Sequence, residues 1–100
     1  MLIITGYLDV EPDRSAALVA ALENVARLSQ AEEGCHDYVF MNDPLVPGRV
    51  RVVERWESDD ALKAHFAMPH FAEAGKILGG FAPKAVEILK YEISAVKPLR

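Results

Sequence analysis

The order of hydrophobic patterns along the chain is the feature that most restricts its fold. Four segments show the β-branched or alternating apolar pattern of strands: residues 2–10, 35–43, 49–57 and 84–96. Apolar residues recur at helical spacing over residues 14–32, and a second helical region follows Ser58 and continues from Pro69 to Leu78. The resulting order, β-α-β-β-α-β, predicts an α+β, ferredoxin-like fold, with an antiparallel sheet and helices on one of its faces.

Local signals predict where the helices begin and end. Ser58 is a suitable N-cap, and the carboxylates of Asp59 and Asp60 suit the positive N-terminal end of the helix that follows. Gly34 stands where the first residue after a helix is expected. The pair Gly79-Gly80 is expected to close the second helical region for the same reason.

Length and charge limit the class of protein. A chain of 100 residues suits one hydrophobic core, so we expect a single domain over residues 1–100. The net charge of −4, with no run of Lys or Arg, argues against a nucleic-acid partner. Cys35 is the only cysteine, which excludes an internal disulfide. No apolar run approaches the ~20 residues of a membrane span, and no signal peptide is recognisable, so we expect a cytoplasmic protein without a membrane partner.

The predicted strands are apolar on both faces, which predicts an interface. Successive strand residues point to opposite faces of a sheet, and two helices can cover only one of these faces. The other face would expose a set of large apolar side chains: Ile3, Tyr7, Leu89, Tyr91 and Ile93. An uncovered patch of this kind is typical of an interaction surface. We therefore expect a symmetric homodimer in which two antiparallel sheets pack face to face.

Several polar side chains are candidates for chemistry. His65 shares a predicted helix face with Leu62 and Phe66, and an imidazole can accept or donate a proton near neutral pH. Glu54 and Trp56 share one face of a predicted strand, where a carboxylate among apolar neighbours can act as a base or a hydrogen-bond acceptor. Each of these residues also fits a purely structural role, as a packed core residue or as part of an ion pair.

Aromatic side chains predict a slot for a flat ligand. Tyr38 and Phe40 share a strand face with His36 and are expected either to line a pocket or to fill the core. Further aromatic residues gather in the second helical region: Phe66, Phe71 and Phe81. Such residues are usually core, but they also form the walls of sites for aromatic ligands.

The chain has no motif for a bound cofactor or metal. It lacks a glycine-rich phosphate loop and a dinucleotide fingerprint. His65 and His70 are five residues apart with Pro69 between them, whereas two metal ligands on one helix are normally four apart. We therefore expect neither a metal nor a cofactor.

Two stretches of the sequence resemble the antibiotic biosynthesis monooxygenase family. The first is Glu32-Glu33-Gly34-Cys35-His36-Asp37-Tyr38. The second is Glu54-Arg55-Trp56-Glu57-Ser58, followed by Leu62-Lys63-Ala64-His65 and Met68-Pro69-His70-Phe71. The resemblance covers nearly the whole chain and is to the small, quinol monooxygenase-like members.

The resemblance implies a dimeric α/β barrel with one pocket per subunit. It also implies oxidation of electron-rich aromatics, such as quinols and hydroxyanthrones, by O₂ without a metal, flavin or haem. Carried over by position, His65 and Trp56 are pocket residues, while Tyr38 and Glu54 orient a phenolic oxygen. The position matching the axial histidine of haem-degrading members holds Gly75, and the first strand has no asparagine, so haem is disfavoured. A non-catalytic, small-molecule-binding or stress-response dimer is the alternative on the same fold.

Overall fold

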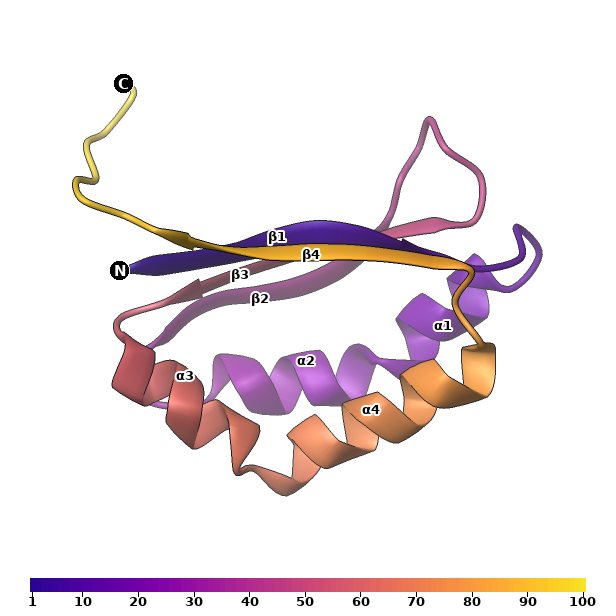
Figure 1. Ribbon diagram of the computed structural model, residues 1–100, viewed down its shortest axis with the longest axis horizontal. Coiled ribbons are helices and arrows are strands. Elements are labelled where there is room, and N and C mark those ends of the chain that lie inside the picture. Colours follow the sequence, from indigo (N-terminus) through magenta and orange to yellow (C-terminus); the bar gives the residue numbers. More distant parts are fainter.

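The computed structural model describes residues 1–100. Its elements in chain order are β1 (Leu2–Asp9), α1 (Ser15–Ala21), α2 (Glu23–Gln30), β2 (Cys35–Asn42), β3 (Arg49–Trp56), α3 (Asp59–Phe66), α4 (Pro69–Phe81) and β4 (Ala85–Glu92). The strands form one antiparallel sheet in the order β2-β3-β1-β4. The helices all lie against one face of this sheet (Figure 1). The predicted α+β, ferredoxin-like fold is confirmed.

The first helical region consists of two helices rather than one. Between α1 and α2, the amide of Leu22 is shared between the carbonyls of Leu18 and Val19, and the helix axis changes direction there (Figure 1). Leu22 is fully buried on the core side of this turn. The apolar spacing of residues 14–32 therefore continues through the break and conceals it.

Gly34 lies directly before β2 and is not the first residue after a helix, contrary to the prediction. The helix α2 ends at Gln30, and Gly34 belongs to the following turn with a φ of +83°, a left-handed conformation that favours glycine. A Cβ atom at this position would lie 2.7 Å from the Cβ of Ala61 in α3. The glycine is thus needed both for the turn and for the close approach of the neighbouring helix.

The helix α4 is longer than predicted and the last strand is shorter. Gly79-Gly80 lie inside α4, which continues to Phe81. It ends there because Pro83 disfavours helical geometry in the residue before it, and Ala82 adopts a left-handed φ of +47°. The last strand covers residues 85–92 of the predicted 84–96. No helix has the length and hydropathy needed to span a bilayer.

The core lies between the inner face of the sheet and the helices. Alternate residues of β1 and β3 enter it: Leu2, Ile4, Leu8, Val50, Val52 and Trp56. The helices contribute Leu18, Leu22, Val25 and Leu62. Burial of one such side chain is worth about 1.5–3 kcal/mol. Buried residues in β1 and β3 thus alternate with less buried ones, as expected for strands with one face against the core.

The outer face of the sheet has no helix over it (Figure 1). Its apolar side chains are half-buried or exposed, as predicted: Ile3, Tyr7, Leu89, Tyr91 and Ile93. Leu89 and Tyr91 in β4 keep 48% and 46% of their surface exposed. Nothing within one chain covers this face.

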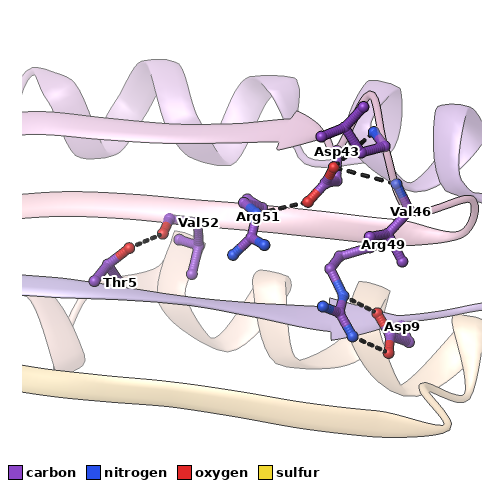
Figure 2. Close-up of polar contacts among 8 residues, drawn as sticks. Thr5, Asp9, Asp43, Val46, Arg49, Arg51 and Val52 are labelled. Carbon is purple, nitrogen blue, oxygen red and sulfur yellow. Dashed lines mark hydrogen bonds and ion pairs between the residues drawn. The ribbon is translucent and has the colours of Figure 1, made fainter.

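Ion pairs fasten one end of the sheet (Figure 2). Arg49 donates two hydrogen bonds to Asp9, of 2.8 and 3.0 Å, and its guanidinium carbon lies 3.6 Å from the ring centroid of Tyr7. Arg51 Nε donates to Asp43 Oδ2 at 2.7 Å, and Asp43 Oδ1 accepts the amide of Val46 in the turn that follows β2. These contacts tie β1 and the β2–β3 turn to β3.

Candidate functional site

A cavity of about 480 Å³ lies between the inner face of the sheet and the helices α3 and α4. The predicted site residues that line it are Tyr38, Phe40, Glu54, Leu62, His65, Phe66 and Phe71. The rest of its wall, which the sequence reasoning missed, consists of Ile4, Leu8, Val52, Ala74, Gly75, Leu78, Ile88, Leu89 and Lys90. A mainly apolar cavity with a few polar groups is typical of a small-molecule site.

Two predicted site residues do not line the cavity. Trp56 is fully buried behind it, with its ring centroid 4.7 Å from that of His65. Phe81 lies at the far end of α4, where it packs against the core and under the guanidinium of Arg14 at 4.4 Å. Phe81 lies outside the cavity wall because it is the last residue of the extended helix α4, and its predicted substrate-binding role stays a prediction.

Glu54 is a buried carboxyl group in the cavity wall. Its Oε1 accepts a hydrogen bond of 2.9 Å from Trp56 Nε1, which satisfies the N–H group of the buried indole. The pKa of Glu54 is raised to about 7, mainly by burial and to a smaller extent by the nearby charge of Glu32, while the Trp56 hydrogen bond opposes the shift. Glu54 can therefore exchange a proton near neutral pH.

Tyr38 places a phenol in the same wall. The residue is 3% exposed, and its ring packs edge-on against those of Phe40 and His65, with centroids 5.4 and 5.3 Å away. Burial raises the pKa of Tyr38 well above its usual range, and the charge of Glu54 adds to this effect. The phenol consequently stays protonated at neutral pH and can donate a hydrogen bond.

A second carboxylate, Glu32, connects His65 with His70. Glu32 Oε2 lies 2.6 Å from His65 Nδ1 and 2.7 Å from His70 Nε2. The side chains of His65 and Glu32 are almost fully buried, with 1% and 6% of their surface exposed. Helical spacing gave no reason to expect the two histidines to share one partner. They do so because the chain turns at Met68, which places His65 in α3 and His70 in α4.

The same three side chains are the one group in the chain with its ligand atoms placed for a metal ion, all within 4.8 Å of one another. Both histidine nitrogens, however, lie at hydrogen-bond distance from a single oxygen. Nitrogen and oxygen ligands of a tetrahedral zinc ion, with bonds of about 2.0–2.1 Å, are roughly 3.3 Å apart. The geometry is therefore that of a hydrogen-bonded cluster. Gly75 lines the cavity but offers no side chain to a haem iron.

His36 does not share the cavity face with Tyr38 and Phe40, contrary to the sequence interpretation. The pairing of β2 with β3 shifts register between Cys35 and Asp37. This irregularity places His36 outside the cavity, where its Nε2 pairs with Glu57. A bulge adds one residue to a strand and reverses the alternation of faces, which the residue pattern alone did not reveal.

The fold and the cavity define a small ferredoxin-like domain with an apolar pocket under its sheet, and the comparisons with known proteins place it in a family. The sequence profile of the family described as antibiotic biosynthesis monooxygenase matches residues 1–76. The chain therefore belongs to the antibiotic biosynthesis monooxygenase family.

Individual relatives agree with this assignment. Rv0793 from Mycobacterium tuberculosis is 33% identical, over 78% of each chain. The "probable quinol monooxygenase YgiN" of Escherichia coli K12 is 29% identical, over 67% of this chain and 66% of its own. A crystal structure from Deinococcus radiodurans, named "putative antibiotic biosynthesis monooxygenase", has a TM-score of 0.88 at 26% identity and covers 100% of this chain and 99% of its own. Fold and family are thus shown by independent comparisons.

Proposed function

We propose that this protein is a cofactor-independent monooxygenase that oxidises a small, electron-rich aromatic compound, such as a quinol or a hydroxyanthrone, with O₂. The observation that carries the proposal is the placement of His65: its buried imidazole lies in the wall of a mainly apolar cavity, and a carboxylate accepts a hydrogen bond from its Nδ1. The family and the name of the relative YgiN support the same reaction class.

The proposed chemistry begins with a proton transfer. The substrate hydroxyl loses its proton to His65, and the resulting aryloxide is a stronger reductant than the neutral phenol. It passes electrons to O₂, which is the oxidant and the source of the inserted oxygen. For a quinol, one oxygen atom enters the ring as a hydroxyl group and the other leaves as water, while the quinol becomes a hydroxyquinone. The atoms and electrons balance without a further reductant.

The other candidate residues have supporting roles in this proposal. Tyr38, which stays protonated, donates a hydrogen bond to a substrate oxygen. Glu54 accepts a hydrogen bond or a proton from a second substrate hydroxyl. Leu62, Phe66 and Phe71, with Phe40, hold the aromatic ring by apolar contact and exclude water.

The direct test is O₂ uptake by the purified protein with a panel of reduced quinols and hydroxyanthrones, in the presence of a chelator. Autoxidation without protein is subtracted. Uptake well above that background is the expected result. Tight binding of the same compounds without O₂ uptake would instead establish a small-molecule-binding protein and would contradict the monooxygenase proposal.

We also propose that the protein acts as a homodimer, in which two outer sheet faces pack together. The uncovered apolar residues of that face, Leu89 and Tyr91 among them, favour such a pairing. The cavity lies on the inner side of the sheet, and Leu89 in the edge strand β4 is the one outer-face residue that also contributes to its wall. A partner on the outer face therefore leaves the rest of the pocket wall in place.

Tyr91→Asp tests this pairing, because Tyr91 lies on the outer face and does not line the cavity, and the substitution puts a charge into the proposed interface. The expected result is a fall in solution mass from twice the chain mass of 11.0 kDa to the chain mass itself. Leu45→Asp is the matched control, since Leu45 is 87% exposed in the β2–β3 turn, and it should leave the mass unchanged. Wild-type protein that sediments as a monomer would contradict the proposal.

A further inference from the structure

We propose that Glu32 is the positioning residue of the site: it fixes the tautomer of His65 and stabilises the imidazolium that forms when His65 takes the substrate proton. This inference rests on the proposed function, because it assigns the support of the base named there. Glu32 does not line the cavity and so does not touch the substrate.

The hydrogen-bond pattern identifies which atoms carry protons. One oxygen of Glu32 lies within 2.7 Å of a nitrogen from each of two imidazoles. A carboxylate only accepts hydrogen bonds, whereas a neutral imidazole has one donor and one acceptor nitrogen. Both contacts are satisfied when Glu32 is ionised and each ring donates to it. His65 then carries its proton on Nδ1, and His70 carries its proton on Nε2.

This assignment leaves a free lone pair on His65 Nε2. This nitrogen makes no hydrogen bond within the chain. Ser29 Oγ is the only fully enclosed side-chain polar atom without a partner, so His65 Nε2 is not fully enclosed. Since His65 lines the cavity, Nε2 is the atom that meets the substrate. In the other tautomer Nε2 would carry a proton and could not accept one.

The charge of Glu32 also favours the proton transfer itself. When the substrate O–H bond breaks and an N–H bond forms at Nε2, His65 gains a positive charge in a nearly dry environment. An ionised carboxylate 2.6 Å from Nδ1 offsets that charge. Without it, the buried imidazolium would lack a partner.

His70 holds the carboxylate in place. Its Nε2 donates the second hydrogen bond to Glu32 Oε2, and its side chain is 12% exposed, between the buried cluster and the surface. Two donors on one oxygen restrict the rotation of the carboxylate, so that Glu32 stays aligned with His65. The two carboxyl groups near the pocket therefore differ in role. Glu32 supports a base from behind, while Glu54 faces the cavity directly.

Glu32→Gln tests the inference, with Glu33→Gln as the matched control on the exposed neighbouring side chain. Long-range ¹H–¹⁵N NMR spectra of the three imidazoles show which nitrogen of each ring carries the proton. Wild-type protein and Glu33→Gln should show His65 protonated on Nδ1. Glu32→Gln should show the other tautomer or a mixture, because the amide presents a donor as well as an acceptor to the two rings.

Steady-state kinetics give the second readout. Glu32→Gln should lower kcat by about 100-fold, the lower end of what a general base contributes, with little change in KM, because Glu32 does not contact the substrate. His70→Asn should lower kcat less, since the Glu32–His65 bond remains. If Glu32→Gln fails to fold, the His70→Asn variant and the wild-type tautomer still decide the matter.

The outcomes separate this inference from the proposed function. Wild-type His65 protonated on Nε2, or a Glu32→Gln variant as active as Glu33→Gln, would overturn the role of Glu32. Absence of turnover in the wild type and in every variant would overturn the monooxygenase proposal. The NMR spectra would then still show whether Glu32 fixes the tautomer of His65. Tight binding of added Zn²⁺ that shifts both His65 and His70 resonances would identify the cluster as a metal site and overturn the inference.

Discussion

His65→Gln is expected to abolish nearly all O₂ uptake above autoxidation, a loss of at least about 100-fold in kcat. Glutamine nearly matches histidine in reach and can still accept a hydrogen bond, but it cannot take up a proton. His65 is 1% exposed and packs against Tyr38, Trp56 and Phe71, so a substitution of similar size preserves the cavity better than alanine would. The measurement is O₂ consumption with the best quinol substrate under chelator.

The control for this experiment is His36→Gln. His36 lies outside the cavity and pairs with Glu57, so its loss should leave turnover within about twofold of the wild type. Circular dichroism establishes that both variants are folded. Retained uptake in folded His65→Gln would show that His65 is not the proton acceptor, and Glu54 would then be the next group to replace.

Glu54→Gln is expected to stabilise the protein at alkaline pH, by about 3 kcal/mol in the free energy of unfolding. Burial raises the pKa of Glu54 from 4.5 to about 7 in the folded chain. Each tenfold difference in the acid dissociation constant between the folded and unfolded states corresponds to roughly 1.4 kcal/mol. Glutamine keeps an oxygen for the Trp56 hydrogen bond and carries no charge.

The pH dependence follows from the direction in which the pKa of Glu54 moves on folding. Below pH 4.5 the carboxyl is protonated in both states, so it costs the folded state nothing. As the pH rises toward 7, the unfolded chain ionises first and gains free energy that the folded chain does not. The wild type therefore loses stability over this interval, whereas Glu54→Gln does not.

Urea unfolding at a series of pH values measures this difference, at one protein concentration throughout. The two curves should coincide near about pH 4 and separate toward about pH 8. Glu73→Gln on the exposed surface of α4 is the control and should follow the wild type. A Glu54→Gln variant no more stable than the wild type at about pH 8 would show that the buried carboxyl carries no penalty in the folded state.

The sheet and its faces were predictable from the sequence because they depend on a local rule. Alternation in residues 49–57 places Val50, Val52 and Trp56 on one side, and the structure buries all three. Turn residues between the apolar segments marked where one element ends and the next begins, which gave the order of strands and helices along the chain. Helix ends were less predictable. Gly79-Gly80 were expected to end α4, but the helix continues through them, because glycines with open space around them tolerate helical geometry. Pro83 ends the helix instead.

The candidate site was predictable only where its residues share an element. His65, Leu62 and Phe66 belong to one helix, and their grouping required nothing more than helical spacing. Glu32 lies in a loop 33 residues before His65, and its approach to both histidines depends on how α2, α3 and α4 pack. The contribution of β4 to the cavity wall likewise depends on the pairing of β1 with β4, which is tertiary information. No local pattern marks such contacts.

The position of β1 in the sheet has a consequence for how the molecule is made. β1 lies between β3 and β4, and Ile4 pairs directly with Lys90. Pairings between residues so distant in sequence form slowly, and during synthesis the edge of β1 that pairs with β4 stays unpaired until β4 has left the ribosome. Because Ile4 and Lys90 both line the cavity, a nascent chain has no complete pocket. A ligand can thus bind in the complete pocket only after β4 has paired with β1, so binding of a compound in the cavity indicates that this last pairing has formed.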